Sequence, residues 1–459
     1  MAERFDAIVV GTGQAGPALA ARLGSAGLKV AVAERGRFGG TCVNTGCIPT
    51  KALVASAYVA RLARRAAEYG VIIDGTISVD MRRVKARTDE ISGRSRDGVE
   101  QWMRGHPNVK VFTGHARLEG AQRVRIGAGL IEAERIFLDV GGRALAPPIP
   151  GLAGTPYLTN ATVLDLDEVP EHLIVVGASY IGLEFGHMYR RFGARVTIVE
   201  KAERPIARED PDVSQAVREI LEAEGVAFEL SADCLAVAAA GRGVRVTSRC
   251  GGGTADLEGS HLLVAVGRRP NTDDLGLEAA GVETDSHGYI KVDDQLGTSI
   301  PGIWALGECN GRGAFTHTAY NDYEIVAANL LDGGRRSVRD RIPAYGLFID
   351  PPLGRVGMTE AEVRRSGRKA LVGTRPMTRV GRAVEKGETR GFIKILVDAE
   401  SGQILGASIL GVGGDEAVHS LLDVMYARAP YTTVTQAVHI HPTVCELLPT
   451  VLGELKPLP

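Results

Sequence analysis

A short segment that begins at Gly39 holds two cysteines with the chemistry of a redox pair. Four residues separate Cys42 from Cys47, a spacing that allows a disulfide if the backbone between them bends. Pro49 suits the first turn of a helix, where its missing N–H would lack a partner anyway. The unpaired N–H groups and positive dipole at that helix start would favour a thiolate, and Lys51 adds a cation. The segment therefore predicts a reactive pair.

Two other interpretations of the pair are compatible with its residue types. Free cysteines are often small buried residues that never bond to one another. A structural zinc site usually needs two closely spaced pairs of ligands. The other cysteines stand singly in the sequence, at Cys234, Cys250, Cys309 and Cys445. We therefore favour redox chemistry and expect no metal site.

The residues before this segment have the order of a dinucleotide-binding unit. Residues 5–10 are predicted to form a buried parallel strand, and residues 17–23 a helix. A glycine-rich turn between them would let a pyrophosphate approach the helix start. A second strand at 29–33 ends in Glu34, which is placed to accept hydrogen bonds from a ribose. The turn consists of Gly11, Thr12, Gly13, Gln14, Ala15 and Gly16.

The same unit recurs later in the chain. A strand at 172–176 precedes a second glycine-rich turn, and a helical stretch follows from Leu183. The next strand, at 195–199, ends at Glu200, so the acid follows the first glycine at the same interval in both units. This turn consists of Gly177, Ala178, Ser179, Tyr180, Ile181 and Gly182, with Ser179 where a second glycine is usual. Two nucleotide sites beside a cysteine pair indicate electron transfer from one cofactor through another to sulfur.

With these motifs the chain resembles, over essentially its whole length, the class I pyridine nucleotide–disulfide oxidoreductases. This family includes lipoamide dehydrogenase, glutathione reductase and mercuric reductase. The resemblance implies an α/β fold with two Rossmann-like domains, which bind non-covalent FAD and NAD(P)H, and a C-terminal α+β dimerisation domain. The expected domains are an FAD segment at 1–150, an NAD(P) domain at 151–267, a second FAD segment at 268–342 and a dimerisation domain at 343–459.

The resemblance also assigns binding residues outside the two turns. Glu308 follows a strand-like stretch at 302–306 and stands where the family usually has an Asp that holds the ribityl chain of the flavin. Residues 141–151 resemble the crossing to the NAD(P) domain, and residues 264–271 resemble the return. The other implied contacts are Gly40, Thr41, Lys51, Ala116 and Gly141 for FAD, and Gly267 for NAD(P).

The catalytic roles implied by the resemblance form a relay. Cys47 would face the flavin, and Cys42 would exchange with substrate. Lys51 would lie by the flavin ring, paired with Glu184. Tyr180 stands where the family has a ring that gates the nicotinamide pocket, and a plain packing role is its alternative.

A motif near the C-terminus supplies the expected acid–base. His441 would move the proton that each thiol cycle requires, and Glu446 would orient its ring. In the family this pair reaches the disulfide of the other subunit, so the resemblance implies a homodimer. The neighbouring Cys445 is expected to be an inert core thiol, and His439 a surface or capping residue.

The nicotinamide and the electron acceptor are less tightly specified. Glu200 would bond an unphosphorylated ribose and so favours NADH, although Lys201, Arg204 and Arg208 follow it and would attract a phosphate. The chain is most similar to the mercuric-reductase-like group and the flavoproteins of reactive-chlorine resistance. It lacks the C-terminal cysteine pair of mercuric reductases, so the acceptor stays open between a disulfide, a metal ion and a small oxidant. The alternatives are a dihydrolipoamide dehydrogenase and a flavin-containing redox sensor without turnover.

Composition agrees with an enzyme of this size. The 459 residues suffice for three or four domains, and 44% of them are hydrophobic, enough for large cores. A net charge of −2 from 53 basic and 55 acidic residues gives no footprint for nucleic acid or an anionic membrane. We find no apolar run long enough to cross a bilayer and expect no secretory signal before residue 5, so a cytoplasmic location is expected.

Overall fold

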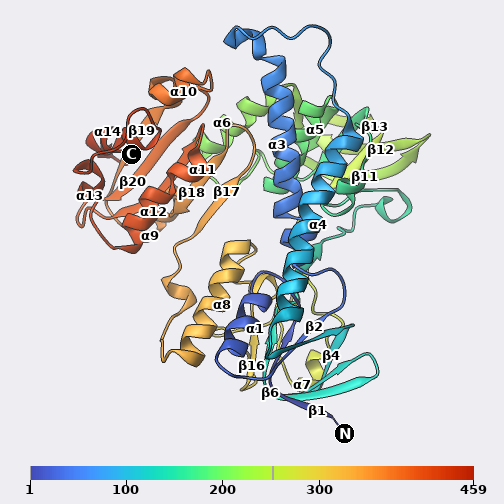
Figure 1. Ribbon diagram of the computed structural model, residues 1–459. Coiled ribbons are helices and arrows are strands. Elements are labelled where there is room, and N and C mark those ends of the chain that lie inside the picture. Colours follow the sequence, from blue (N-terminus) through green and yellow to red (C-terminus); the bar gives the residue numbers. More distant parts are fainter. Residues whose placement is uncertain (1, 251–252) are drawn as a thin grey trace.

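The computed structural model describes residues 2–250 and 253–459. Its chain builds a lower mixed sheet and an upper parallel sheet, stacked one above the other in Figure 1, and an antiparallel sheet beside the upper one. This mixed α/β architecture, with an α+β C-terminal part, confirms the fold class expected from the sequence.

The lower sheet is organised around its first strand. That strand, β1 (Glu3–Val10), lies between two parallel neighbours, and its residues point alternately to two separate cores, Ile8 to one and Val9 to the other. Burial of both faces explains why the second half of the strand, Ala7–Val10, is a continuous apolar run. In spatial order the sheet is β3 (Val109–Thr113), β2 (Val30–Glu34), β1, β6 (Gly129–Leu138), β5 (Arg123–Ile126) and β4 (Ala116–Gly120), and β16 (Ile303–Ala305) also pairs with β6.

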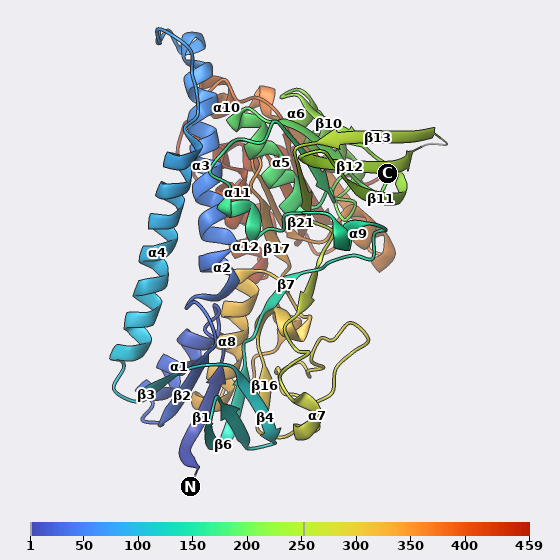
Figure 2. The same ribbon diagram turned by 90° about the vertical axis from the view of Figure 1, so that its right-hand side faces the viewer.

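Helices cover this sheet and lead away from it. The helix α1 (Gly16–Ser25) has a proline in its first turn and packs its buried face on the sheet together with α8 (Thr316–Leu331). The short α2 (Gly40–Asn44) leads into α3 (Cys47–Arg64), which lies beside α4 (Met81–Gly105) as a long hairpin (Figures 1 and 2). The helix α4 begins at Met81, where the Asp80 side chain caps its first turn by accepting from the backbone N–H of Arg83.

The upper sheet repeats the pattern with four parallel strands. Leu173 and Val175 of its central strand face one core, while Ile174 and Val176 face another. In spatial order the strands are β10 (Val226–Glu229), β9 (Arg195–Val199), β8 (His172–Val176) and β14 (His261–Val264). The helices α5 (Tyr180–Phe192) and α6 (Pro211–Glu222) follow β8 and β9, and an antiparallel sheet of β11 (Ala232–Ala240), β12 (Gly243–Cys250) and β13 (Gly253–Gly259) flanks them.

Two short strands join the upper and lower parts. The strand β7 (Gly142–Ala144) leads upward, β15 (Arg268–Pro270) leads back, and the two pair antiparallel. The segments that resemble the outward and return crossings therefore lie side by side. After the return, the chain adds α7 (Leu277–Ala280), β16 and α8 to the lower part.

The C-terminal part is an antiparallel sheet covered by short helices. Its strands, in spatial order, are β17 (Ala344–Leu347), β18 (Leu353–Gly357), β21 (Ile404–Leu410), β20 (Phe392–Asp398), β19 (Ala370–Pro376) and β22 (Lys456–Pro457). Its helices are α9 (Glu360–Ser366), α10 (Gly381–Glu385), α11 (Gly414–Ala417), α12 (His419–Tyr426), α13 (Thr432–Thr435) and α14 (Leu448–Gly453).

A buried lysine ties this part to the upper sheet. The Nζ of Lys394, which is 2% exposed, lies 2.9 Å from Asp210, 2.7 Å from Asp212 and 2.9 Å from Glu360. The three carboxylates are close enough to hold a metal ion, but the ammonium group of Lys394 already lies among them and pairs with all three.

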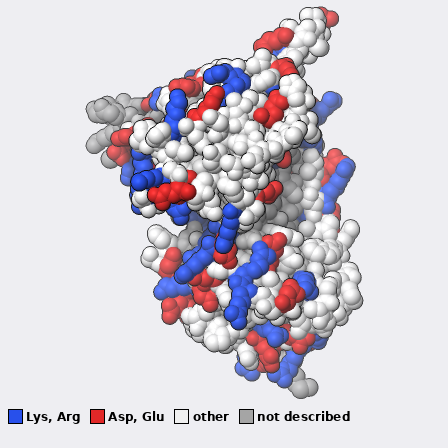
Figure 3. All heavy atoms as spheres, turned by 90° about the vertical axis from the view of Figure 1, so that its left-hand side faces the viewer, with Lys and Arg blue, Asp and Glu red and all other residues white. Residues whose placement is uncertain are grey.

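The face of the molecule shown in Figure 3 carries charges of both signs. Lys and Arg are interspersed with Asp and Glu over the face shown in Figure 3, on both sides of the waist between the upper and lower halves. Among the residues that the structure describes, no helix has both the length and the apolar character needed to span a membrane.

Candidate active site

A cavity of about 1070 Å³ runs from the glycine turn after β1 to the start of α3 and α8. It brings together most of the residues predicted for the flavin and the redox pair. Those that line it are Gly11, Gly13, Gln14, Glu34, Gly40, Thr41, Cys42, Cys47, Lys51, Ala116, Gly141, Tyr180, Ile181, Glu184 and Glu308. Ala15 and Gly16 lie just behind the turn, at the start of α1.

The backbone of the first turn is held in a form that only glycine allows. Gly11 has φ +101°, and a Cβ there would lie 2.1 Å from the carbonyl oxygen of Asp139. A Cβ on Gly16 would lie 2.4 Å from the carbonyl oxygen of Gly11, and one on Gly40 would lie 2.8 Å from the Cα of Gly13. The close packing leaves no room for a side chain at these positions, as the close approach of a phosphate to the turn requires.

Glu34 sits at the end of β2 and is fixed by the same turn. Its Oε2 accepts from the backbone N–H of Thr12 at 3.0 Å and from the Thr12 hydroxyl at 2.6 Å, and its Oε1 accepts from the N–H of Gly36 at 2.8 Å. The carboxylate is therefore oriented before any ligand binds.

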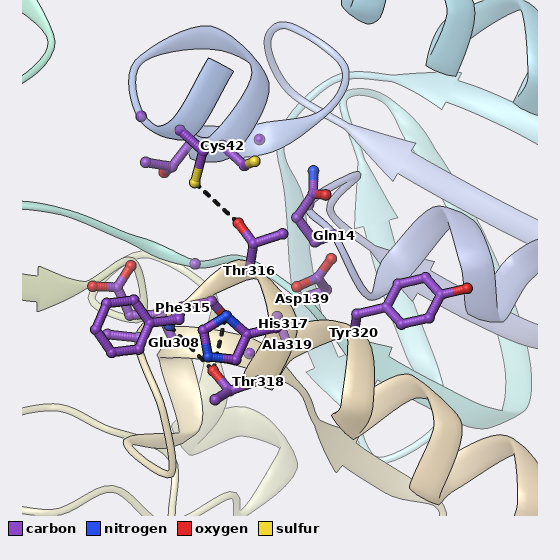
Figure 4. Close-up of a pocket in the computed structure, with 18 of the residues that line it drawn as sticks. Gln14, Cys42, Asp139, Glu308, Phe315, Thr316, His317, Thr318, Ala319 and Tyr320 are labelled. Carbon is purple, nitrogen blue, oxygen red and sulfur yellow. Dashed lines mark hydrogen bonds between the residues drawn. The ribbon is translucent and has the colours of Figure 1, made fainter. Parts of the chain in front are cut away.

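Asp139 follows the last residue of β6 and faces the same turn from below, on the side of the cavity where Figure 4 also shows Gln14. It is 5% exposed, and its Oδ2 accepts from the N–H of Gly16 at 2.7 Å. Burial raises the pKa of Asp139 to about 7, and the charges of Asp322 and Glu34 act in the same direction.

The two cysteines lie at the opposite wall of the cavity as free thiols. Cys42 is in α2, and Cys47 is the first residue of α3, with Pro49 in the same turn. The Sγ of Cys47 is 3.1 Å from the hydroxyl oxygen of Thr316, the contact drawn as a dashed line in Figure 4. The two sulfurs also hydrogen-bond to each other.

The environment of the two sulfurs separates their protonation. Hydrogen bonding with Cys42, helped by Thr316 and by the charge of Lys51, lowers the pKa of Cys47 to about 6, against the effect of burial. The same contact between the sulfurs, together with burial, raises the pKa of Cys42. At neutral pH Cys47 is therefore the thiolate and Cys42 the thiol.

Lys51 joins the cysteine helix to the upper domain. Its Nζ lies 2.7 Å from Oε2 of Glu184 on α5 and 4.5 Å from the centre of the Phe348 ring. Glu184 is 4% exposed, and its Oε1 accepts from the backbone N–H of Phe348 at 2.9 Å. The predicted Lys–Glu pair is present, and the buried carboxylate fixes the position of the ammonium group.

A stack of rings closes the cavity beside Tyr180. Phe315 is nearly parallel to His317 at 5.4 Å on one side and to Tyr345 at 5.8 Å on the other. The ring of Tyr180 leans on Phe315 at 5.6 Å, so the predicted gating ring rests against a fixed partner.

Glu308 is held by an arginine. Its two oxygens accept from Nε and Nη2 of Arg268 at 2.6 Å and 2.9 Å, and Nη2 also donates to the carbonyl of Gly142 at 2.7 Å. Glu308 has a longer side chain than the Asp usual in the family, and Arg268 directs this side chain toward the paired strands β7 and β15.

The second glycine turn copies the first, and only its residues Tyr180 and Ile181 line the cavity. Gly177 has φ +108°, and its Cβ would lie 2.5 Å from the carbonyl oxygen of Ala265, while a Cβ on Gly182 would lie 1.9 Å from the carbonyl of Gly177. Glu200 accepts from the N–H groups of Ala178 at 2.7 Å and Ala202 at 2.9 Å. Gly177, Ser179, Gly182, Glu200 and Gly267 are not among the residues that line the cavity.

The predicted acid–base pair is formed but does not line the cavity of its own chain. Nδ1 of His441 is 2.7 Å from Oε2 of Glu446, and the His441 side chain is 80% exposed. Cys445 is partly buried, 3.6 Å from the hydroxyl of Ser420. The side chains of Cys234 and Cys250 lie outside the described part of the structure.

Several site residues were not indicated by the sequence. Asp139 carries a detectable signal, because an acid directly after a buried apolar run marks the carboxyl end of a parallel strand, where ligands bind. No such sequence signal marks the remaining three residues. Thr316 contacts Cys47, Phe315 contacts Tyr180 and Arg268 contacts Glu308 only because the folded chain brings distant segments together.

The cavity fits a flavin dinucleotide in size and donor set. Its length connects a phosphate-binding turn and a ribose-binding acid at one end with the sulfur pair at the other. Closely packed glycines leave no side chain where the diphosphate would approach.

Two family models match the chain. The model described as pyridine nucleotide-disulphide oxidoreductase matches residues 5–322, and the model of the dimerisation domain of the same family matches residues 343–452. Together they cover nearly the whole sequence.

Relatives of known type extend over the full chain. A probable pyridine nucleotide-disulfide oxidoreductase RclA from Escherichia coli is 36% identical over 99% of this chain and 100% of its own length. A dihydrolipoyl dehydrogenase from Chlamydia muridarum is 31% identical over 97% of this chain and 96% of its own, and a mercuric reductase from Streptomyces lividans is 30% identical over 97% and 94%. A solved Cu(II) complex of the HOCl-induced flavoprotein disulfide reductase RclA from Escherichia coli superimposes with a TM-score of 0.90 at 35% identity, covering 98% of this chain and 99% of that one.

Proposed function

The chain belongs to the pyridine nucleotide-disulfide oxidoreductases, which are FAD-dependent enzymes with a dimerisation domain, and from that premise we propose how it works. We propose that it passes electrons from a nicotinamide dinucleotide to the Cys42–Cys47 pair and on to a disulfide, a metal ion or a small oxidant. One observation carries this proposal. A phosphate-binding turn lines the same cavity as a pair of sulfurs whose surroundings stabilise one of them, Cys47, as a thiolate.

The residues of the chain have distinct tasks in binding. The turn from Gly11 to Gly16 would hold the flavin diphosphate through backbone N–H groups, and Glu34 would hold the ribose. The second turn and Glu200 would hold the nicotinamide dinucleotide, with Tyr180 at its ring. Bound FAD supplies the transfer of two electrons between nicotinamide and sulfur.

The sulfur pair then carries the electrons to the acceptor. Opening a Cys42–Cys47 disulfide consumes two electrons and two protons and yields two thiols. One proton is released at neutral pH, because the pKa of Cys47 is about 6, while Cys42 keeps its own and is the sulfur that exchanges with substrate. His441 of the partner subunit, oriented by Glu446 of the partner subunit, would take and return the proton of Cys42. The high exposure of His441 suits a contact across a dimer.

We infer that NADH is the preferred donor. Both oxygens of Glu200 are anchored on backbone N–H groups, which keeps a negative carboxylate at the end of β9 where a 2′-phosphate would be repelled. Cu(II), the metal named for the solved RclA complex, is the first metal acceptor to try.

Anaerobic titration of the yellow holoprotein with NADH and NADPH, followed by acceptors, tests the proposal. We expect one equivalent of NADH to produce a long-wavelength band from the Cys47 thiolate beside the flavin, and turnover with Cu(II) or a small disulfide. Cys47→Ser should lose both. Full acceptor turnover in Cys47→Ser would refute the role of the pair.

The two alternatives give different results in the same assay. A dihydrolipoamide dehydrogenase would turn over lipoamide faster than any other acceptor. A sensor without turnover would bind flavin and form the disulfide but oxidise NADH negligibly with every acceptor. Neither alternative has better support than the general oxidoreductase.

A further inference from the structure

A carboxyl group lies at the helix end that the flavin diphosphate would use. The Asp139 side chain accepts from the N–H of Gly16 at 2.7 Å, at the start of α1. A Cβ on Gly13 would lie 2.8 Å from the same carboxyl oxygen, so the acid is packed directly under the turn. An ionised Asp139 would therefore compete with the two negative charges of a diphosphate for the positive end of α1.

Backbone N–H groups of Gly16 and Ala15 are hydrogen-bonded to Asp139, but no cationic side chain pairs with it among the described residues. Within the described residues it has no ion pair, and the titratable groups that face it are themselves acidic or neutral. Glu34 faces it from the end of β2, and Asp322 faces it from α8 with its charge directed to Arg341. Cys309 faces it with a thiol whose pKa burial raises to about 12, so this thiol is neutral. The turn from Gly11 to Gly16 contributes no ionisable side chain, and the ionisable residues of β1 (Glu3, Arg4 and Asp6) precede its last four residues, Ala7–Val10, which are apolar.

The second unit shows that the fold does not require this acid. The carbonyl of Asp139 closes on Gly11 just as the carbonyl of Ala265 closes on Gly177. The two residues occupy the same place, directly after the parallel strands β6 and β14. An alanine side chain suffices there in the unit predicted for the nicotinamide dinucleotide.

We propose that the flavin dinucleotide binds at the Gly11–Gly16 turn together with a proton on Asp139, so that flavin affinity falls as the pH rises. The inference rests on the proposed place of the diphosphate at this turn. Protonation removes the repulsion between Asp139 and the diphosphate, whose charge is constant in the neutral range.

Proton linkage fixes both the direction in which flavin affinity changes with pH and the pH range in which it changes. The pKa of Asp139 is about 7 before flavin binds, and an adjacent dianion raises it further. Below pH 7 Asp139 is already neutral, and affinity is flat. Between the two pKa values the bound state holds one more proton than the free state, so the dissociation constant rises up to about tenfold per pH unit.

The test measures flavin release from the holoprotein. The holoprotein is diluted at fixed ionic strength between pH 6 and 9, and the fluorescence of released FAD gives the dissociation constant. We expect the constant to be flat near pH 6 and to rise above pH 7 in the unmodified chain. Asp139→Asn should show a flat profile and tighter binding at pH 8–9, because an amide keeps the acceptor for Gly16 without a charge.

Comparing the unmodified chain with Asp139→Asn isolates the effect of the Asp139 charge on flavin affinity. Glu34 and Asp322 are present in both proteins, so any titration of theirs appears equally in both profiles. A flat profile in the unmodified chain, or the same slope in Asp139→Asn, would overturn the inference while leaving the redox proposal standing. Failure of the unmodified chain to bind FAD would overturn both.

A second measurement does not need the variant to fold. FAD release from the unmodified holoprotein in weak buffer at pH 8 should liberate up to one proton per flavin, read with an indicator dye. The absence of proton release at pH 8 would overturn the inference by itself.

Discussion

The two dinucleotide-binding units have nearly the same backbone but different chemistry around it. Gly11 and Gly177 have φ values of +101° and +108°, and each packs on the carbonyl of the residue that follows a parallel strand. That residue is Asp139 in the first unit and Ala265 in the second. The glycine pattern thus fixes the turn, whereas residues outside the pattern decide what the turn does.

The two units also lead into helices that contribute different functional residues. The first unit leads into α3, whose first residue is the Cys47 thiolate, and the second leads into α5, which contributes Glu184. The ion pair between Lys51 and Glu184 connects them. The sulfur chemistry therefore belongs to the first unit, and the second unit positions the cation beside it.

The largest expected effect separates the units by a matched pair of substitutions. Gly16→Val should weaken retention of flavin, and Gly182→Val should weaken binding of NADH and slow reduction by it while the protein stays yellow. Each side chain would meet a carbonyl oxygen within 2.4 Å of the Cβ, so we expect losses of about 10- to 100-fold in affinity. Flavin content and stopped-flow reduction measure them. Loss of flavin in Gly182→Val would contradict the independence of the two units.

A smaller effect is expected at the link between the units. Lys51→Met leaves the buried Glu184 without its cation and should lower the rate of flavin reduction by NADH about tenfold, which corresponds to ~1.4 kcal/mol. Glu184→Gln keeps an acceptor for the Phe348 N–H and should lose less. A larger loss in Glu184→Gln than in Lys51→Met, in rapid-reaction measurements, would reverse the assigned roles.

Thr316 should tune the sulfur of the first unit. Its hydroxyl is one of the groups that lower the pKa of Cys47 to about 6, so Thr316→Val should raise that pKa by about one unit, and Thr316→Ser should leave it nearly unchanged. Because the thiolate exists above its pKa, alkylation of reduced Cys47 at pH 6 should slow in Thr316→Val. Identical pH profiles for the valine and serine variants would show that the hydroxyl does not act on the sulfur.

The smallest effect concerns the second unit. Ala265 cannot ionise, so we expect NADH affinity to change less than about threefold between pH 7 and 9, where flavin affinity changes more. Binding titrations of the holoprotein measure both. If NADH affinity depended on pH as steeply as flavin affinity does, Asp139 would not be the source of the pH dependence.

The sequence predicted the parts of the site that depend on local order. Both glycine turns, Glu34, Glu200 and the helix that starts at the cysteines follow from strand and helix patterns over short stretches. The resemblance to the family added the Lys51–Glu184 pair, which no local pattern joins, because the two residues lie on separate helices.

What the sequence did not predict depends on contacts between distant segments. Thr316 reaches Cys47, Phe315 reaches Tyr180 and Arg268 reaches Glu308 only because α8 and the return strand fold back on the first unit. Pairing of β7 with β15 sets the direction of Glu308, and no property of that residue alone reveals it. Such contacts are visible only in the folded chain.

Labelling of thiols before and after reduction tests the central claim most directly. The oxidised holoprotein is treated anaerobically with one equivalent of NADH, denatured in the presence of the alkylating reagent so that both thiols can react, and analysed by peptide mass spectrometry. The account predicts that Cys42 and Cys47 become labelled together and that Cys309, which is fully buried, does not change. Reduction of the flavin by NADH with no new label on Cys42 and Cys47 would contradict it.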